Sequence, residues 1–541
     1  MSSTNNGTDT INAAARDAAM QAMRQVSVTP TGIVEYRSKG KVIIIGGDEA
    51  IECAPRVNEN LQAQVLLLEG SEEPGVPLVP AGGRKISIDG YLGAFTISLG
   101  EPGKPNFEQM TADMILDLGA KPQLTMSMKP PGYVVATSDS VATGDALQTL
   151  QDLVGTFEKP RYFNYNADIC AHSRSGKAGC NRCIDACPAY AIISIGEKIE
   201  VNPNLCQGGG ICSTVCPTGA ITYAYPSAAD SLNRLRVLLQ TYTTKGGQDP
   251  VVAIVAEHDV DGVDDAMPSN ILLFAVEELA SVGLDFWLAA LAYGAKAVRL
   301  IDTASNPDWV RSLLVEQIGF VTPMVTGLGY PAEAIRMMTA IELAADMPTV
   351  MPAIKPATFG GLTEKRRVAY LALDHLFEQA TTPNAFIDLP AGAPFGAIEI
   401  DKQRCTLCLA CTSACPASAV TAGGDGPQLV FNETNCVQCG ICQSTCPEQA
   451  IHLIPRFIAD PSQRQRAELL HSEEPFCCVN CGKPFAPKAA IEKMLSKLED
   501  HYMFQGAKAR QRLKMCEDCR VVDVVQDNEA MGRGLPPVVR H

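Results

Sequence analysis

Two stretches of the chain share one cysteine pattern, CTLCLACTSACP at residues 405–416 and CVQCGICQSTCP at residues 436–447. In each, three cysteines are separated by two residues, and a fourth follows after three intervening residues, directly before a proline. In runs of this kind three cysteines bind one [4Fe–4S] cluster and the fourth binds the neighbouring cluster. Two identical four-cysteine runs disfavour zinc. The pattern predicts one cluster on Cys405, Cys408, Cys411 and Cys446, and a second on Cys436, Cys439, Cys442 and Cys415.

A related pair of runs lies upstream, and its first run departs from the pattern at one position. Lys177 stands where the first cysteine belongs, and Cys170 lies seven residues earlier across a polar, glycine-containing insert. Such an insert can loop out and return the thiol to the site. With the fourth ligand crossing over from the second run, the predicted ligands are Cys170, Cys180, Cys183 and Cys216.

The second upstream run lacks a cysteine, because Gly209 stands at the position of its second ligand. Three predicted ligands remain, namely Cys187, Cys206 and Cys212. Three thiolates suit a [3Fe–4S] cluster, or a [4Fe–4S] cluster whose odd iron takes water or another side chain. An empty site is the remaining alternative. Loss of a thiolate also removes negative charge, and we expect it to alter the reduction potential.

Two further CxxC pairs lie near the C-terminus, Cys478 with Cys481 and Cys516 with Cys519. Paired CxxC knuckles are typical of a tetrahedral Cys₄ site, and neither pair is followed by a proline. We therefore expect one structural zinc ion in a zinc-ribbon-like module, with a helix at 490–498 packed on it. A rubredoxin-like iron or a further cluster is the alternative.

Composition places limits on the remaining possibilities. The 541 residues are 46% hydrophobic and 19% charged, which predicts several folded domains, and the net charge of −16 argues against a nucleic-acid-binding surface. No signal peptide and no membrane-spanning apolar run are visible. Twenty-one cysteines without an export signal indicate metal or redox chemistry in a reducing compartment, so we expect a cytoplasmic protein.

The region before the first cysteine cluster has a βαβ pattern. Residues 42–45 and 65–68 are predicted buried strands, and 50–64 the helix between them. The dinucleotide fingerprint fails after its first glycine, because Asp48 and Ile51 follow Gly46 at the other two positions. We therefore predict a degenerate Rossmann-like domain that is structural, with nucleotide binding as the less favoured alternative.

Residues 217–404 contain no cysteine, and their middle part has an α/β pattern. Predicted strands occupy 251–255, 271–274 and 298–301, and helical spacing covers 276–293. Without cysteines this region cannot hold a thiolate-ligated cluster of its own. We interpret it as a docking or spacer domain.

The assembled motifs resemble bacterial multi-cluster proteins with 4Fe–4S dicluster, ferredoxin-type domains. The resemblance is carried by Cys170-Ala-His-Ser-Arg-Ser-Gly176, by the two dicluster runs and by Phe476-Cys-Cys-Val-Asn-Cys-Gly-Lys-Pro-Phe485. It implies a redox subunit whose partners are redox proteins of the formate dehydrogenase type. The middle region is weakly similar to iron–sulfur subunits of methanogen-type hydrogenase and heterodisulfide reductase systems, which implies a flavodoxin-like fold.

The predicted fold class is therefore α/β and α+β multidomain. The expected domains are a flexible leader (1–35), an N-terminal α/β domain (36–160), ferredoxin module 1 (161–228), a middle α/β domain (229–388), ferredoxin module 2 (389–458) and a Cys₄ metal-binding module (459–541). The expected cofactors are three [4Fe–4S] clusters, the three-cysteine cluster and one zinc.

These cofactors predict an electron-transfer protein that relays single electrons between a donor oxidoreductase and an acceptor. The sequence shows no general acid–base pair, nucleophile motif or phosphate loop, so a carrier or redox subunit is favoured over a stand-alone enzyme. Two alternatives are a flavin-containing oxidoreductase subunit that uses the clusters as an internal relay, and an iron–sulfur sensor or scaffold.

Overall fold

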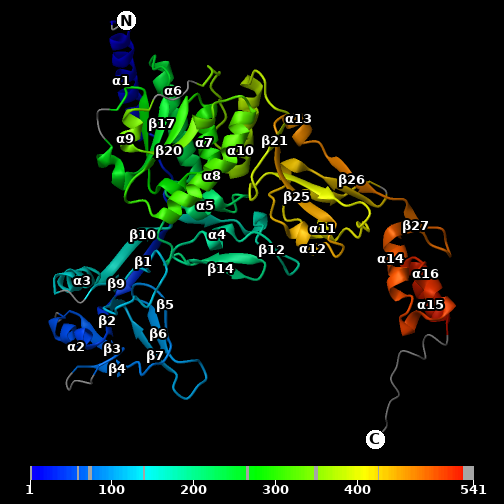
Figure 1. Cartoon of the computed structure of the whole chain (residues 1–541), viewed down its shortest axis with the longest axis horizontal. Helices are drawn as coiled ribbons and strands as arrows, with labels where there is room; N and C mark the ends of the chain where they lie inside the picture. The colour runs from blue at the N-terminus through cyan, green and yellow to red at the C-terminus, as the bar shows by residue number, and fades with distance from the viewer. Residues whose placement is uncertain are drawn as a thin grey trace. The chain divides into compact units, whose positions relative to one another are not determined.

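The computed structural model of the chain describes residues 3–57, 60–70, 76–137, 140–263, 267–346, 351–424 and 426–527. It is a mixed α/β, multidomain structure whose chain divides into two compact units (Figure 1). The first unit contains Met1–Ala167, Asn181–Ile318 and Glu333–Ala372. The second contains Asp168–Cys180, Gly319–Ala332 and Leu373–His541. The boundary after Cys180 falls inside the first upstream cysteine run.

A five-stranded parallel sheet forms the centre of the N-terminal domain, with strand order β4-β3-β2-β8-β9. Its strands are β2 (Lys41–Gly46), β3 (Gln62–Leu67), β4 (Leu78–Pro80), β8 (Met114–Asp117) and β9 (Tyr133–Val135). Both expected strands are confirmed. They are apolar throughout because alternate residues enter two cores, Val42 and Ile44 on one face and Ile43 and Ile45 on the other.

Different elements cover the two faces of this sheet. Helices α2 (Asp48–Cys53) and α3 (Ser140–Asp152) contribute to the first core, which also buries Cys53. The second core is closed by an antiparallel sheet of β5 (Ile86–Asp89), β6 (Phe95–Leu99) and β7 (Glu108–Ala112). The expected helix over 50–64 is wrong in extent, because α2 ends at Cys53 and a short 3₁₀ turn with Pro55 follows.

The flexible leader expected over residues 1–35 is also wrong. Residues 3–24 form helix α1 (Ser3–Arg24), which packs along α6 (Ala228–Thr244). The helix buries Ala15, Ala19 and Met23, which follow one another at a spacing of four residues. Strand β1 (Ile33–Ser38) then pairs with β10 (Gly155–Pro160), so residues 33–38 belong to the folded domain as well.

The middle domain is built on a four-stranded parallel sheet with strand order β18-β17-β19-β20. Its strands are β17 (Val251–Ala256), β18 (Ile271–Val276), β19 (Ala297–Asp302) and β20 (Ile335–Thr339). The three expected strands are confirmed. Its further helices are α7 (Leu284–Ala292), α8 (Asp308–Gly327), α9 (Ala340–Ala344) and α10 (Lys365–Gln379). The helix expected over 276–293 starts later, at Leu284, because a 3₁₀ turn and Gly283 precede it.

The upstream cysteine runs in the first unit lie on short helices, α4 (Arg182–Asp185) and α5 (Ile211–Val215), which contact each other. Two small antiparallel pairs flank them. These are β11 (Phe163–Tyr165) with β16 (Ile221–Tyr223), and β14 (Ile192–Ile195) with β15 (Lys198–Val201).

The downstream runs in the second unit repeat this plan with α11 (Ala410–Ala414) and α12 (Ile441–Thr445), which are also in contact. Two sheets surround them, β21-β25-β22 and β23-β24-β26. Their strands are β21 (Phe386–Asp388), β22 (Gly396–Ile400), β23 (Val420–Ala422), β24 (Gln428–Phe431), β25 (Ile451–Ile458) and β26 (Glu468–Ser472). Because β21 and β26 belong to these sheets, the module is longer than the predicted 389–458.

The C-terminal part contains a β-hairpin and three helices. The elements are β27 (Pro475–Cys477), β28 (Pro484–Pro487), α14 (Lys488–Leu498), α15 (Ala507–Arg512) and α16 (Glu517–Gln526). Helix α14 confirms the helix expected at 490–498. Among the described residues, no helix has the length and apolar character that a membrane crossing requires.

Candidate metal centres

The first downstream site is a cavity of about 370 Å³, open space at its mouth included, beside helix α11. Four cysteines line it, Cys405, Cys408, Cys411 and Cys446. Burial, together with the thiols of Cys408, Cys405 and Cys446, raises the pKa of Cys411 to about 12. The structure thus brings together the four cysteines that the sequence pattern grouped, three from one run and one from the other.

The second downstream site is a similar cavity of about 350 Å³ beside helix α12. It is lined by Cys415, Cys436, Cys439 and Cys442. Burial and the neighbouring thiols raise the pKa of Cys439 to about 11, although the N–H group of Ile441 acts to lower it. The fourth cysteine of each run therefore lines the cavity formed by the other run.

Both downstream cavities fit a cubane in the chemistry of their donors. The N–H of Ala419 donates to Cys415 Sγ over 3.2 Å, and the N–H of Ala450 donates to Cys446 Sγ over 3.3 Å. Each donor lies four residues after its cysteine, just beyond the proline. N–H···S bonds of this kind stabilise thiolate charge and raise the potential of a bound cluster. The cluster itself supplies reversible one-electron chemistry when bound.

The three upstream cysteines also lie together, within the first unit. Burial raises the pKa of Cys212 well above its ordinary value, and the thiols of Cys206, Cys187, Cys183 and Cys216 raise it further. The ligands predicted for the three-cysteine site, Cys187, Cys206 and Cys212, are thus neighbours.

The loop around Gly209 keeps the backbone of a complete cluster-binding loop. Gly208 and Gly210 have φ values of +85° and +72°, and their downstream equivalents Leu407 and Leu409 have +50° and +58°. A Cβ at Gly209 would have its nearest neighbours at 3.9 Å, namely Met128 Cε and Trp309 Cη2. The position thus has the conformation and the room for a cysteine, and lacks only the side chain.

One side of this loop is held by a tyrosine and a lysine from other elements. Tyr223 Oη donates to the carbonyl of Gly208 over 2.8 Å. Lys159 Nζ donates to the carbonyl of Cys206 over 2.6 Å. Burial lowers the pKa of Lys159 to about 8, although the nearby Cys206 acts to raise it. A cation therefore lies beside the site that has one thiolate fewer.

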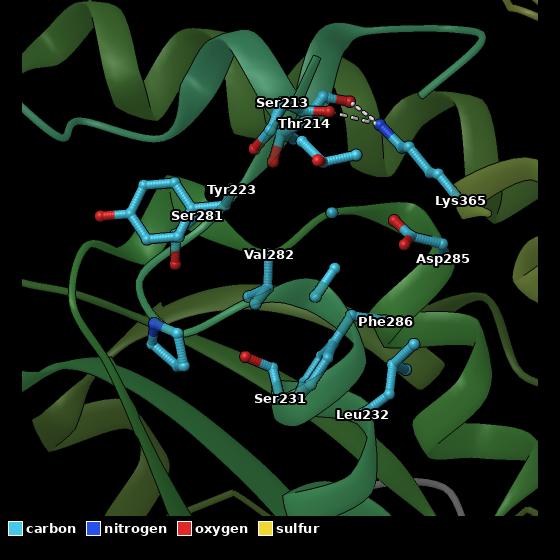
Figure 2. Close-up of a pocket in the computed structure, with 14 residues that line it drawn as sticks. Ser213, Thr214, Tyr223, Ser231, Leu232, Ser281, Val282, Asp285, Phe286 and Lys365 are labelled. Atoms are coloured by element: carbon cyan, nitrogen blue, oxygen red, sulfur yellow. Dashed lines mark hydrogen bonds between the residues drawn. The ribbon is translucent and has the colours of Figure 1, made fainter. Parts of the chain in front are cut away.

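A second lysine holds the other end of the same run, where helix α5 leads into Cys216. Lys365 Nζ donates to the carbonyls of Ser213, Thr214 and Cys216, over 2.7, 2.6 and 3.0 Å. Figure 2 shows the amine of this lysine pointing toward Ser213 and Thr214, with Asp285 close by on the same side of a pocket of about 470 Å³, open space included, which all four residues line. Burial lowers the pKa of Lys365, and Asp285 opposes this effect.

The first upstream run is divided between the two units. Cys170 and Cys180 belong to the second unit, whereas Cys183 and Cys216 belong to the first. The predicted four-cysteine set therefore stays a prediction from the sequence. Within the second unit, the hairpin of β12 (Ser173–Arg174) and β13 (Lys177–Ala178) packs on α12, and a Cβ on Gly179 would meet Ile441 at 2.5 Å.

The four C-terminal cysteines form a compact group. The sulfurs of Cys478, Cys481, Cys516 and Cys519 lie within 4.8 Å of one another, and those of Cys481 and Cys516 are 3.7 Å apart. Zn–S bonds of about 2.3 Å in a tetrahedron place the sulfurs about 3.8 Å apart. A cubane keeps its ligands farther apart because four irons lie between them. The group therefore has the dimensions of a site for a single metal ion.

The thiolate form is favoured at one of these cysteines. Burial acts to raise the pKa of Cys478, but the N–H groups of Cys481, Cys516 and Asn480 outweigh it and lower the value to about 6. Metal ions bind the deprotonated thiolate, so these N–H groups prepare the site for a cation.

The glycine turn after β2 offers poor support for a nucleotide. The N–H of Gly47, at the position where a phosphate would bind, donates to Glu49 Oε1 over 2.8 Å. A carboxylate already fills this position, and the following helix α2 is only six residues long. A nucleotide phosphate would have to displace this carboxylate.

Several residues at the three-cysteine site were not identified from the sequence. Lys159 lies 47 residues from Cys206 and Lys365 lies 149 residues from Cys216. Met128 and Trp309 lie 81 and 100 residues from Gly209, and none of the four belongs to a motif. No local pattern distinguishes a lysine that binds carbonyls beside a cluster from a solvated surface lysine. Only the three-dimensional structure reveals them.

Comparison with protein families identifies two regions of the chain. Residues 404–450 match a 4Fe–4S dicluster domain, and residues 199–222 match a 4Fe–4S binding domain. The chain therefore contains iron–sulfur domains of the ferredoxin type. No curated protein matches the chain.

Proposed function

We propose that this protein is an iron–sulfur electron-transfer protein, which relays single electrons between a donor oxidoreductase and an acceptor. The observation that carries the proposal is the crossed arrangement of the downstream cysteines. Each cavity is lined by three cysteines of one run and the fourth of the other, as two neighbouring [4Fe–4S] clusters require. Burial raises the pKa of Cys442, and the thiols of Cys436, Cys439, Cys415 and Cys411 raise it further, which supports two neighbouring sites.

A continuation of the relay toward the upstream clusters is supported within the second unit. Cys180, a proposed ligand of the first upstream cluster, is close enough to raise the pKa of Cys439, a ligand of the second downstream cluster. The chain itself leads from Cys180 to Cys183 in three residues. We propose that electrons reach the downstream clusters through the segment at Cys180.

In this proposal the three-cysteine site is an electron-transfer site that differs from the others. One thiolate fewer and the nearby Lys159 both reduce the negative charge at the cluster. Less negative charge favours the reduced cluster, so we expect the cluster at this site to have a higher reduction potential than those at the four-cysteine sites.

The two α/β domains serve in this proposal as scaffolds. The strand order of the N-terminal sheet corresponds to 3-2-1-4-5, which supports a Rossmann-like domain, and the order 2-1-3-4 of the middle sheet supports a flavodoxin-like one. A flavin phosphate would bind after β17, at the switch point of the middle sheet. That segment carries Glu257, Asp259 and Asp261, so its negative charge disfavours the flavin alternative.

Redox titration of anaerobically purified protein, followed by EPR and by iron and sulfide analysis, tests the proposal. We expect about 15–16 irons per chain and reduced-cluster signals that couple magnetically, because neighbouring clusters interact. Zinc throughout with no labile sulfide would refute electron transfer. A yellow chromophore released by acid would instead favour the flavin-containing subunit.

We further propose that the C-terminal cysteine group holds structural zinc. The sulfur spacing of 3.7 Å between Cys481 and Cys516 supports a single tetrahedral ion. Metal analysis of the purified full-length protein should find about one zinc per chain in addition to iron. Redox partners of the formate dehydrogenase type remain part of the proposal on resemblance alone, and pull-down with such an enzyme tests them.

A further inference from the structure

The corner of the three-cysteine site that lacks a thiolate is closed by two side chains, from Met128 and Trp309. Both lie 3.9 Å from the place of a Cβ at Gly209. Met128 comes from the N-terminal domain and Trp309 from the start of helix α8 in the middle domain. The indole of tryptophan has a hydrogen-bond donor but no lone pair for a metal. The thioether of methionine is a soft donor suited to iron–sulfur clusters.

The segment that carries Met128 is fixed to the cluster-binding loops on both sides. The N–H of Met128 donates to the carbonyl of Pro188 over 3.3 Å, and Pro188 directly follows Cys187. Gln207 Nε2 donates to the carbonyl of Lys129 over 2.6 Å, and Gln207 directly follows Cys206. Two of the three ligand-bearing segments therefore hold residues 128 and 129 in place, which directs Met128 to the open corner.

We propose that the thioether sulfur of Met128 is the fourth protein ligand of this cluster and retains its odd iron, so that the site holds a [4Fe–4S] rather than a [3Fe–4S] cluster. The inference rests on the proposed iron–sulfur function. A neutral thioether replaces a thiolate without restoring its charge. The site therefore keeps four irons and the raised potential together.

The test measures the oxidised [3Fe–4S] EPR signal and the iron content of four anaerobically purified proteins, the wild type and three variants. Met128→Leu removes the sulfur and keeps the approximate volume. Met126→Leu, in the same segment, is the matched control. The double variant Met128→Leu with Gly209→Cys supplies a thiolate at the vacant position, where the nearest atoms leave room for a side chain.

We expect the wild type and Met126→Leu to show little [3Fe–4S] signal, and Met128→Leu to show about one spin per chain with loss of about one iron. The double variant should lose the signal again. Circular dichroism and thermal unfolding that match the wild type show that each variant is folded.

A full [3Fe–4S] signal in the wild type would overturn the Met128 ligand, and so would its absence in a folded Met128→Leu variant. Both results leave the electron-transfer function intact. Absence of labile sulfide in all four proteins would overturn the proposed function as well, so the two failures are distinguishable.

Discussion

The loops at 206–216 and 436–446 share a backbone conformation but are held in different ways. In the downstream loop four cysteines surround the site, and a Cβ on Gly440 would meet its nearest neighbour, Leu453, only at 3.9 Å. In the upstream loop one cysteine is missing, and a Cβ on the equivalent Gly210 would lie 2.5 Å from the Cα of Ser281. The comparison indicates that the upstream loop, which has one cysteine fewer, is held in place by its packing against the middle domain.

The largest effect is expected from Lys365→Met. The substitution leaves three carbonyls at the end of α5 without their donor and the buried Asp285 without a nearby cation. We expect a loss of about 3–4 kcal/mol in the free energy of unfolding, measured by denaturant titration of the cluster-loaded protein.

Lys493 of α14 provides the matched control for this prediction. It pairs with Glu448 beside the downstream loop, and its side chain is 38% exposed. Lys493→Met should therefore lower stability by less than about 1 kcal/mol. Equal losses in the two single variants would show that the upstream loop does not depend on Lys365 in the way described. The double variant Lys365→Met with Asp285→Asn should recover part of the stability that Lys365→Met loses.

A second, smaller effect is expected from alanine at the two equivalent glycines. Gly210→Ala places a methyl group against the backbone of Ser281 and strains a left-handed residue, which predicts a loss of about 2–3 kcal/mol. Gly440→Ala has only the left-handed strain and should lose about 1 kcal/mol. Thermal unfolding and iron retention measure both. Similar losses would contradict the difference in packing.

Adding the missing cysteine should have the smallest effect on stability and a clear effect on the reduction potential. Gly209→Cys completes the upstream set in a position with room for the side chain, and it should change stability by less than about 1 kcal/mol. The added thiolate should lower the potential of that cluster by roughly 100–300 mV, the scale on which ligand replacement acts in iron–sulfur sites.

Cys439→Gly is the converse substitution in the downstream loop. It should raise the potential of its cluster, and an EPR-monitored redox titration of both variants measures the two shifts. Potentials that move in the same direction in both variants would show that thiolate charge is not the controlling factor.

The parts of the molecule specified by local patterns follow from the sequence. Buried parallel strands appear as continuous apolar runs, and the runs at 42–45, 65–68 and 251–255 are strands in the structure. Helix lengths were less predictable. Turns at Pro55 and Gly283 shorten two expected helices. Residues 3–24 form a docked helix whose buried face consists of Asn12, Ala15, Ala19 and Met23.

The sequence by itself determined how the downstream and C-terminal cysteines group together, since these groups follow from spacing within a short loop and from its repetition. The tertiary structure alone decided what surrounds the loop at 206–216. Met128, Lys159, Trp309 and Lys365 come from distant segments, and only the packing of three domains of the first unit brings them to one loop. A motif specifies the ligands of a cluster through local geometry, whereas the charge and the closure of its site are long-range properties of the fold.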